Sequence, residues 1–302
     1  MSTDVALTHV WPSLAHELKD LRERRAAQVR AAAARLDERF VVPPTLDARQ
    51  YALLHHFTYA ITAEVRARRL DDAGDLIQRW ATASTASGTS LLPGHDVGIV
   101  AADECERSDD DRYESPLFLH LDPASRAVPS APWSGAGEAI QRAGLDHFIT
   151  SVTGVVVTMQ ARGRRDTTQS YALKALPGTI FIDVVQDPVR LGELILHESA
   201  HTLLNEIFTA CGVDLDPEAR WYSPWKQAYR PAYGLLHAGF AFGVLQKYFE
   251  FHAAASDRPS AYARIRAEIG AEQWDLARGS VRDALAEVRD ERVASLLWNF
   301  VA

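Results

Sequence analysis

Cysteine is scarce in this sequence, and long apolar runs are absent. The chain has two cysteines among 302 residues, Cys105 and Cys211, which are too far apart to form a closely spaced pair of metal ligands. We therefore expect no disulfide framework, and a reducing cytoplasm is the expected location. No run of about 18 apolar residues occurs, so a membrane-spanning helix is not expected. The first residues also lack the apolar segment of a secretory signal.

An excess of positive charge is also absent. The sequence carries 40 acidic and 32 basic residues, which gives a formal net charge of -8. This balance argues against nucleic acid as the main partner, because binding to a phosphate backbone depends on clustered Lys and Arg. A neutral or cationic peptide is compatible with it. With 47% apolar residues, a chain of 302 residues can bury a large core in one or two domains.

Helical periodicity dominates the beginning of the chain. Residues 13–40 and 47–87 are rich in helix-forming residues, and their apolar positions recur at helical steps. A turn-rich segment, SGTSLLPGH, then interrupts the pattern at 87–95. We predict an N-terminal helical region over residues 1–92. A metal-binding catalytic region is predicted over residues 93–302, packed with the first as one compact unit.

Short strand-like segments follow this break. They are residues 96–101, 116–122, 152–160 and 170–175, and the β-branched run within 176–185. An acidic run at 108–114 is interpreted as a solvated loop, and a short helix is predicted over residues 137–145. The sequence therefore predicts an α+β fold that is mostly helical, with a small central β-sheet.

A well-marked helix is predicted from about residue 188 to residue 209. Asp187 is a favourable N-cap, and Pro188 suits the first helical position. At the other end, Gly212 can supply a left-handed cap. These signals place the sequence HESAH in the middle of the helix.

The chain after this helix is aromatic and interrupted by prolines. We expect residues 213–231 to form a long ordered loop with a short helical piece. A second helix is predicted from Pro231 to about Ala255. A third helical segment is predicted over residues 260–300.

The HESAH sequence has the spacing of a metal site. Residues four apart lie on one face of a helix, so His197 and His201 can present two imidazoles to one ion. Glu198 lies beside the first histidine and can act as a base or orient a ligand. The neighbouring residues are apolar, and a buried polar group without a partner costs about 1–3 kcal/mol. A bound metal would remove this cost.

A third ligand is needed, and His237 is the best candidate. The extended zinc-protease pattern HExxHxxGxxH fails, because Leu204 and Ile207 stand at its glycine and last histidine positions. The acidic candidates Glu206, Glu218 and Glu250 are less favourably placed along the chain. His237 lies among apolar residues in the next predicted helix. The nearby Gly234 and Gly239 would allow a second helix or a substrate to approach closely.

Three neutral histidines do not by themselves identify the metal. They leave the charge of a divalent ion uncompensated and leave positions open for water, oxygen or a chelating co-substrate. This arrangement suits zinc hydrolysis. It also suits non-haem iron, although the usual iron triad has two histidines and one carboxylate.

The three motifs LPGTIFID, DPVRLGELILHESAH and WYSPWKQAYRPAYGLLHAGFAF together resemble a known family. They are similar to the HExxH-type peptide β-hydroxylases associated with ribosomally made, post-translationally modified peptides. The resemblance covers about residues 135–255 and includes the R-P-x-x-G-x-x-H spacing that ends at His237.

The resemblance implies a zincin-like helical scaffold and an Fe(II)- and 2-oxoglutarate-dependent oxygenase. Its implied reaction uses molecular oxygen to hydroxylate a side-chain β-carbon in a precursor peptide. His197, His201 and His237 would hold iron, and Glu198 would orient the site or the substrate. Two alternatives stay open: a zinc metallopeptidase with Glu198 as the general base, and a non-catalytic module that binds a peptide.

An oxygenase of this kind needs a partner for the distant carboxylate of 2-oxoglutarate. Arginine is the usual choice, and Arg230 lies seven residues before His237, about 10 Å along a helix axis. Arg230 could instead cap the loop or pair with Glu218. The competing cations are Arg162, Arg164, Arg165 and Lys174.

Aromatic residues around the predicted site suggest where a peptide could bind. Tyr233 and Trp225 are the predicted substrate-binding residues, with Trp221 and Tyr229 as further candidates. Each could equally belong to the core. The remaining histidines show no ligand spacing. Among them, His120 and His147 could line the site once the chain is folded.

Overall fold

The protein is α+β and mostly helical in the computed structural model. The structure describes residues 3–35, 46–83, 90–92, 95, 97–102, 105–107, 117–119, 131–163, 165–255, 257 and 259–301. The chain folds into two compact units. We call Arg22–Leu191 the central unit, and Met1–Leu21 with Gly192–Ala302 the terminal unit. This division differs from the expected boundary at residue 92.

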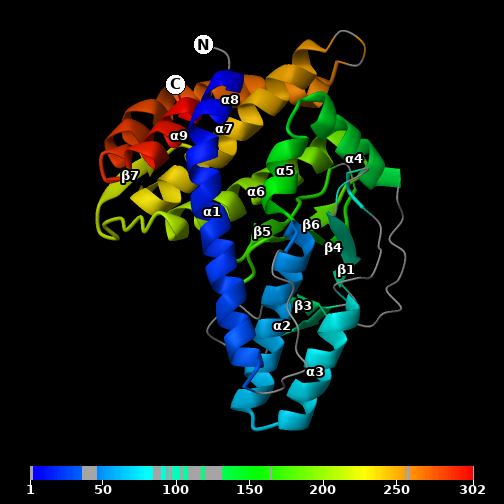
Figure 1. Ribbon diagram of the computed structural model, residues 1–302. Helices are drawn as coiled ribbons and strands as arrows, with labels where there is room; N and C mark the ends of the chain where they lie inside the picture. Colours follow the sequence, from blue (N-terminus) through cyan, green and yellow to red (C-terminus); the bar gives the residue numbers. More distant parts are fainter. Residues whose placement is uncertain are drawn as a thin grey trace. The chain divides into compact units, whose positions relative to one another are not determined.

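Helices account for most of the described chain (Figure 1). They are α1 (Thr3–Ala33), α2 (Ala48–Arg66), α3 (Leu70–Ala83), α4 (Ala131–Arg142), α5 (Asp146–Val152), α6 (Pro188–Ala210), α7 (Ala232–Ala254), α8 (Ala261–Leu285) and α9 (Glu291–Val301). The strands are β1 (Gly98–Ala101), β2 (Cys105–Arg107), β3 (Leu117–Leu119), β4 (Val155–Ala161), β5 (Ser170–Ala172), β6 (Thr179–Val184), β7 (Arg220–Ser223) and β8 (Ala228–Pro231).

The central unit contains a small mixed sheet in the order β1-β4-β6-β5. The first three strands are parallel, and β5 pairs antiparallel with β6 at the edge. β4 and β6 begin with the buried runs Val155–Thr158 and Thr179–Asp183. Continuous β-branched runs are typical of strands covered on both faces. Each predicted strand segment therefore overlaps an observed strand, although most of the strands are shorter than predicted.

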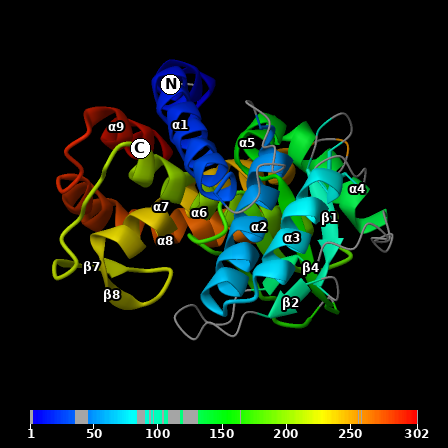
Figure 2. The ribbon, with the colours of Figure 1, turned by 60° about the horizontal axis from the view of Figure 1, so that its bottom comes forward.

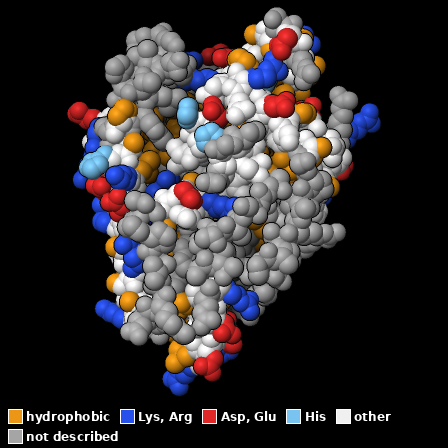
Figure 3. Space-filling model, turned by 45° about the vertical axis from the view of Figure 1, so that its right-hand side comes forward, with side chains coloured by type: hydrophobic (Ala, Val, Ile, Leu, Met, Phe, Trp, Pro, Cys, Tyr) orange, Lys and Arg blue, Asp and Glu red, His pale blue; other side chains and the backbone are white. Residues whose placement is uncertain are grey.

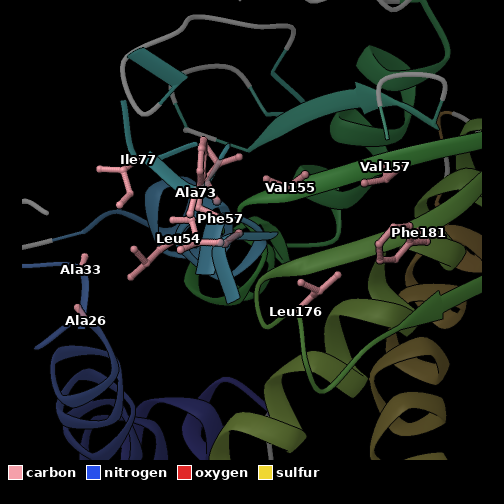
Figure 4. Packing of buried hydrophobic residues seen from close by; sticks show 13 residues of the cluster. Ala26, Ala33, Leu54, Phe57, Ala73, Ile77, Val155, Val157, Leu176 and Phe181 are labelled. Atoms are coloured by element: carbon pink, nitrogen blue, oxygen red, sulfur yellow. The ribbon is translucent and has the colours of Figure 1, made fainter. Parts of the chain in front are cut away.

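Helices α2 and α3 bury their apolar side chains together with this sheet (Figure 4). Leu54 and Phe57 of α2 belong to the same core as Val155, Val157 and Phe181 of the strands. A polar contact crosses this packing: the buried His56 Nε2 lies 2.9 Å from Thr179 Oγ1. Burial lowers the pKa of His56 to about 3, so its imidazole is neutral.

The sequence predicted both ends of α6. Its first turn is capped by Asp187, whose Oδ1 accepts the Arg190 amide at 3.0 Å. At the other end, Gly212 has φ +61°, and the Val213 amide bonds back to the Phe208 carbonyl at 2.8 Å. This left-handed closure is the arrangement expected of a C-terminal glycine. The helix predicted over about 188–209 is confirmed.

In the terminal unit, α7 is the central element. It packs extensively against α8 and α9, and it is apolar around most of its surface. Such a helix must be covered by neighbours on several sides. Gly243 makes this covering possible, because a Cβ there would lie 2.6 Å from the Phe300 carbonyl oxygen of α9. The helices predicted from Pro231 to Ala255 and over 260–300 are confirmed, and the second is divided into α8 and α9.

The prediction of a long loop over residues 213–231 is partly wrong. Its second half is an antiparallel hairpin of β7 and β8, with no helical piece among its described residues. Figure 2 shows the hairpin beside α7 and α8. The paired segments RWYS and AYRP contain the aromatic residues Trp221, Tyr222 and Tyr229, which favour strands. Gln227 takes φ +50° in the tight connection between them.

Three expectations fall on residues outside the described ranges: the acidic run at 108–114, His120 and Arg164. Both cysteines lie inside the described ranges and are free thiols. No helix in the described part of the chain is long and apolar enough to cross a bilayer.

The close packing between α2 and the start of β4 requires glycine at position 154, and this requirement can be tested. A Cβ at this position would lie 2.0 Å from the Ala48 carbonyl oxygen, which is backbone and cannot rotate away. We expect Gly154→Ala to lower the free energy of unfolding by about 3 kcal/mol, through forced displacement of packed elements. Urea denaturation followed by circular dichroism measures this loss.

Gly74 of α3 is the matched control. An added Cβ there would have no neighbour within 4 Å, so Gly74→Ala should raise stability by about 0.5–1 kcal/mol through better helix propensity. Equal effects of the two substitutions would contradict the close approach at Gly154.

Candidate functional site

Three histidines meet where α6 and α7 pack against each other in the terminal unit. His197 Nε2 lies 3.1 Å from His201 Nε2, and His201 Nδ1 lies 3.3 Å from His237 Nδ1. All three predicted ligands are therefore brought together, although His237 is 36 positions from His201 in the chain. Each contact joins two ring nitrogens, and a hydrogen bond between them requires a proton on one of the two.

His197 and His201 belong to a polar stripe along α6. Glu193, His197, His201 and Asn205 follow one another at four-residue steps, which keeps them on one helix face. Each is contacted by another side chain. Arg266 Nη2 of α8 donates to Glu193 at 2.9 Å, and Tyr262 also donates to it.

The contacts of this stripe give the direction of α7 relative to α6. Asn205 accepts a hydrogen bond from the hydroxyl of Tyr233, near the start of α7. One turn along each helix, His201 meets His237. His197 then meets Phe242, with ring centroids 5.3 Å apart. The two helices therefore run antiparallel along the site.

Burial keeps the imidazoles of α6 neutral. It lowers the pKa of His197 to about 3 and that of His201 to about 4. The positive charge of Lys226 lowers both pKa values further, and Arg266 contributes at His197. Neutral imidazole is the form that binds metals. The same cations create a positive potential that favours an anionic ligand.

The ring orientations fit a metal ion only in part. Two nitrogens bound to one tetrahedral ion at about 2.0–2.1 Å lie about 3.3 Å apart, close to the 3.1 Å between His197 Nε2 and His201 Nε2. His237, however, faces the other nitrogen of the His201 ring. Among the described residues, no group of three or more His, Cys, Asp or Glu side chains is arranged to hold a metal. The donor types and their proximity fit, and a rotation of the His201 or His237 ring would be needed.

Glu198 is buried beside the first histidine, with 3% of its surface exposed. Its place on α6 agrees with the predicted role as base or orienting group, which stays a prediction. The other carboxylates considered as ligands differ in their surroundings. Glu206 is buried on α6, Glu218 is exposed before β7, and Glu250 accepts a hydrogen bond from Gln246.

Tyr233 borders the cluster, as its predicted role requires. Its ring centroid is 4.2 Å from that of His237, and 42% of its surface is exposed. Trp225 is more deeply placed. It stacks on Phe242 with ring centroids 5.2 Å apart and meets the edge of Trp274 at 5.0 Å. Trp225 thus supports the wall behind His197, and its contact with a substrate stays a prediction.

Arg230 lies close to the first turn of α7. A Cβ on Gly234 would be 3.2 Å from Arg230 Nε and 3.3 Å from Nη2, so the guanidinium rests in the space that the glycine leaves. His237 follows Gly234 by one helical turn. Gly239 has a different role, since it faces Trp274 and Val281 of α8.

The competing cations lie in the central unit. Arg162 is engaged by the buried Asp183, whose Oδ2 accepts its Nε at 2.7 Å. Asp183 also accepts the amides of Gln160 and Gln169, which makes it a structural carboxylate. Arg165 and Lys174 are exposed, as is His147 on α5.

Three residues of this site were not predicted from the sequence. Glu193 and Asn205 could have been found, because they stand four residues before His197 and four after His201. Lys226 had no such signal, since its position depends on the hairpin turn.

No protein-family model and no curated protein matches the chain. Any function therefore has to be argued from the site itself.

The bond between Tyr233 and Asn205 can be tested by a double-mutant cycle. We expect Tyr233→Phe and Asn205→Ala each to destabilise the protein, with a coupling energy of about 0.5–1.5 kcal/mol. Thermal and urea unfolding of the two single variants and the double variant measure this coupling. Strictly additive effects would show that the hydrogen bond does not join the two helices.

Proposed function

We propose that the protein is a non-haem Fe(II)- and 2-oxoglutarate-dependent oxygenase that hydroxylates a side-chain β-carbon of a ribosomally made precursor peptide. One observation carries this proposal: three histidines from two helices meet in a half-buried cluster, and the cations Lys226 and Arg266 lie near enough to raise the potential at it. Buried neutral imidazoles are suited to a divalent metal. The surrounding cations favour a co-substrate that is a dianion.

In this proposal His197, His201 and His237 hold the metal, and α6 is the metal helix of a zincin-like scaffold. Iron with 2-oxoglutarate and molecular oxygen would supply an oxidant, placing one oxygen atom in the peptide and one in succinate, with release of CO₂. The protein's own contribution is to keep the imidazoles unprotonated and to exclude water on the Phe242 side. Phe242 is stacked on Trp225 and closes that side of His197.

Arg230 is the proposed anchor for the distant carboxylate of 2-oxoglutarate. Its guanidinium lies over Gly234, one helical turn before His237. No ion pair or hydrogen bond engages its side chain within the part of the chain that the structure describes, so the fork can accept a carboxylate. Tyr233 would border the position of the peptide. The reaction would take place in the cytoplasm, where a reducing environment maintains Fe(II).

A zinc metallopeptidase is the second candidate, because Glu198 is buried beside His197. In a peptidase this carboxylate would take a proton from water bound at the metal. In the oxygenase it would only orient neighbouring groups. Glu198→Gln therefore separates the two functions: a peptidase would lose nearly all activity while keeping zinc, and an oxygenase would keep its co-substrate binding.

Anaerobic absorption spectroscopy tests the oxygenase directly and needs no peptide. Metal-free protein is loaded with Fe(II) and then with 2-oxoglutarate. We expect a weak visible charge-transfer band from the chelated co-substrate, which disappears in His237→Ala because a ligand is lost. His147→Ala, which changes an exposed histidine of the central unit, should leave the band unchanged.

The opposite result would favour the peptidase. If no band forms while zinc binds tightly and a fluorogenic peptide library is cleaved, the oxygenase proposal is wrong. If neither Fe(II) nor zinc binds, the cluster is structural and both metal-dependent functions are wrong.

The position of Arg230 leads to a separate prediction. Gly234→Ala would push the guanidinium aside by a few tenths of an ångström without disturbing backbone. We expect it to weaken 2-oxoglutarate binding by about threefold and Arg230→Ala by about tenfold or more, with iron affinity unchanged. Titration of the charge-transfer band gives both affinities. Arg264→Ala on the exposed side of α8 is the control, and equal losses in all three variants would reject the anchor.

A further inference from the structure

The hairpin of β7 and β8 carries only positive charge. Residues 219–231 contain Arg220, Lys226 and Arg230 and no acidic residue, although the whole chain has 40 acidic and 32 basic residues. On the face shown in Figure 3, by contrast, basic and acidic side chains are interspersed. Within the described ranges, none of the three cationic side chains forms an ion pair or hydrogen bond. Their charge is therefore available to an external anion.

Exposed tyrosines gather on the same structure. Tyr222 and Tyr229 of the hairpin and Tyr233 of α7 are 37%, 71% and 42% exposed. They are the exposed tyrosines of the described chain. Tyr222 and Tyr229 are paired across the strands, with ring centroids 5.8 Å apart. Tyrosine offers a large amphipathic contact at low entropic cost, which makes it common in binding surfaces.

The register of the hairpin divides these residues between two faces. Arg220 is paired with Pro231, and Tyr222 with Tyr229, so Arg220 and both tyrosines lie on one face. This face is open to solvent. The opposite face carries Trp221 and the buried Ser223, on the side of the helices. The hairpin therefore presents an outer face that its own unit does not cover.

The hairpin also leads to the histidine cluster. Trp225 at its turn stacks on Phe242, which contacts His197. The next residue, Lys226, contributes positive potential at both His197 and His201. A ligand bound along the outer face would thus have one end near the cluster.

We propose that the outer face of the hairpin, defined by Arg220, Tyr222 and Tyr229, docks an acidic segment of the peptide substrate. This inference rests on the proposed function for the identity of the peptide, but binding itself requires neither metal nor reaction. Arg220 would pair with Asp or Glu of the segment, and the tyrosines would cover the neighbouring part of the peptide. A short acidic segment fits better than nucleic acid, because the net charge of -8 repels a long polyanion more strongly than a segment with a few carboxylates. The acids nearest to the hairpin along the chain, Asp216 and Glu218, precede β7, and Asp216 Oδ1 accepts the Glu218 amide.

Fluorescence anisotropy with full-length, metal-free protein tests the dock. The probe is a labelled 15-residue peptide of alternating Glu, Leu and Gly, compared with the same peptide carrying Gln in place of Glu. We expect the acidic peptide to bind more tightly, with an affinity that falls as NaCl is raised. Arg220→Glu should weaken its binding by about tenfold and Tyr229→Ser by about threefold.

Arg264→Glu is the matched control, since it places the same charge change on an exposed arginine of α8. It should alter binding by less than about twofold. Thermal unfolding confirms that each variant is folded. His237→Ala should bind the acidic peptide as the unchanged protein does, which separates failure of the dock from failure of the oxygenase.

Three results would overturn the dock. They are equal binding of the acidic and Gln peptides, equal losses in Arg220→Glu and Arg264→Glu, and tighter binding of a single-stranded 15-mer DNA that is lost in Arg220→Glu. The last result would assign the face to nucleic acid.

Discussion

A half-buried row of polar side chains on α6 is the constraint on which the terminal unit depends. Polar groups removed from water must find partners or destabilise the fold. Neighbouring helices supply hydrogen-bond partners for this row. Arg266 and Tyr262 of α8 donate to Glu193, while His237 of α7 contacts His201 and Tyr233 of α7 donates to Asn205. Because these contacts occur at successive helical turns, they set the antiparallel register of α6 and α7. The histidine cluster is a consequence of this register.

The rest of the unit makes that register possible. Helix α7 is apolar around most of its surface, so α8 and α9 must cover it. Gly243 allows the close approach of α9, and Gly234 leaves room for Arg230 beside the first turn. The hairpin before α7 then places Trp225 against Phe242, behind His197. The contacts that hold these helices together are therefore also the contacts that form the histidine cluster.

The electrostatics of the cluster are consistent with one kind of ligand chemistry. Burial and the cations Lys226 and Arg266 favour neutral imidazoles, which is the metal-binding form. The same cations attract anions, and Arg230 extends this positive region toward the exposed hairpin. A neutral set of nitrogen donors surrounded by cations suits a metal with an anionic co-substrate. It also suits a substrate that carries negative charge away from the reacting carbon.

Local signals in the sequence determined the elements, and tertiary contacts decided the site. Asp187, Pro188 and Gly212 specified α6 because caps act within a single turn, and the four-residue spacing of His197 and His201 specified a shared face. The same spacing contained Glu193 and Asn205, but their roles became clear only from partners distant in the chain. The hairpin was missed because strand pairing depends on two segments together. The orientation of the His201 and His237 rings, the place of Lys226 and the division into two units followed only from packing, since side-chain torsions and long-range contacts leave no periodic trace in a sequence.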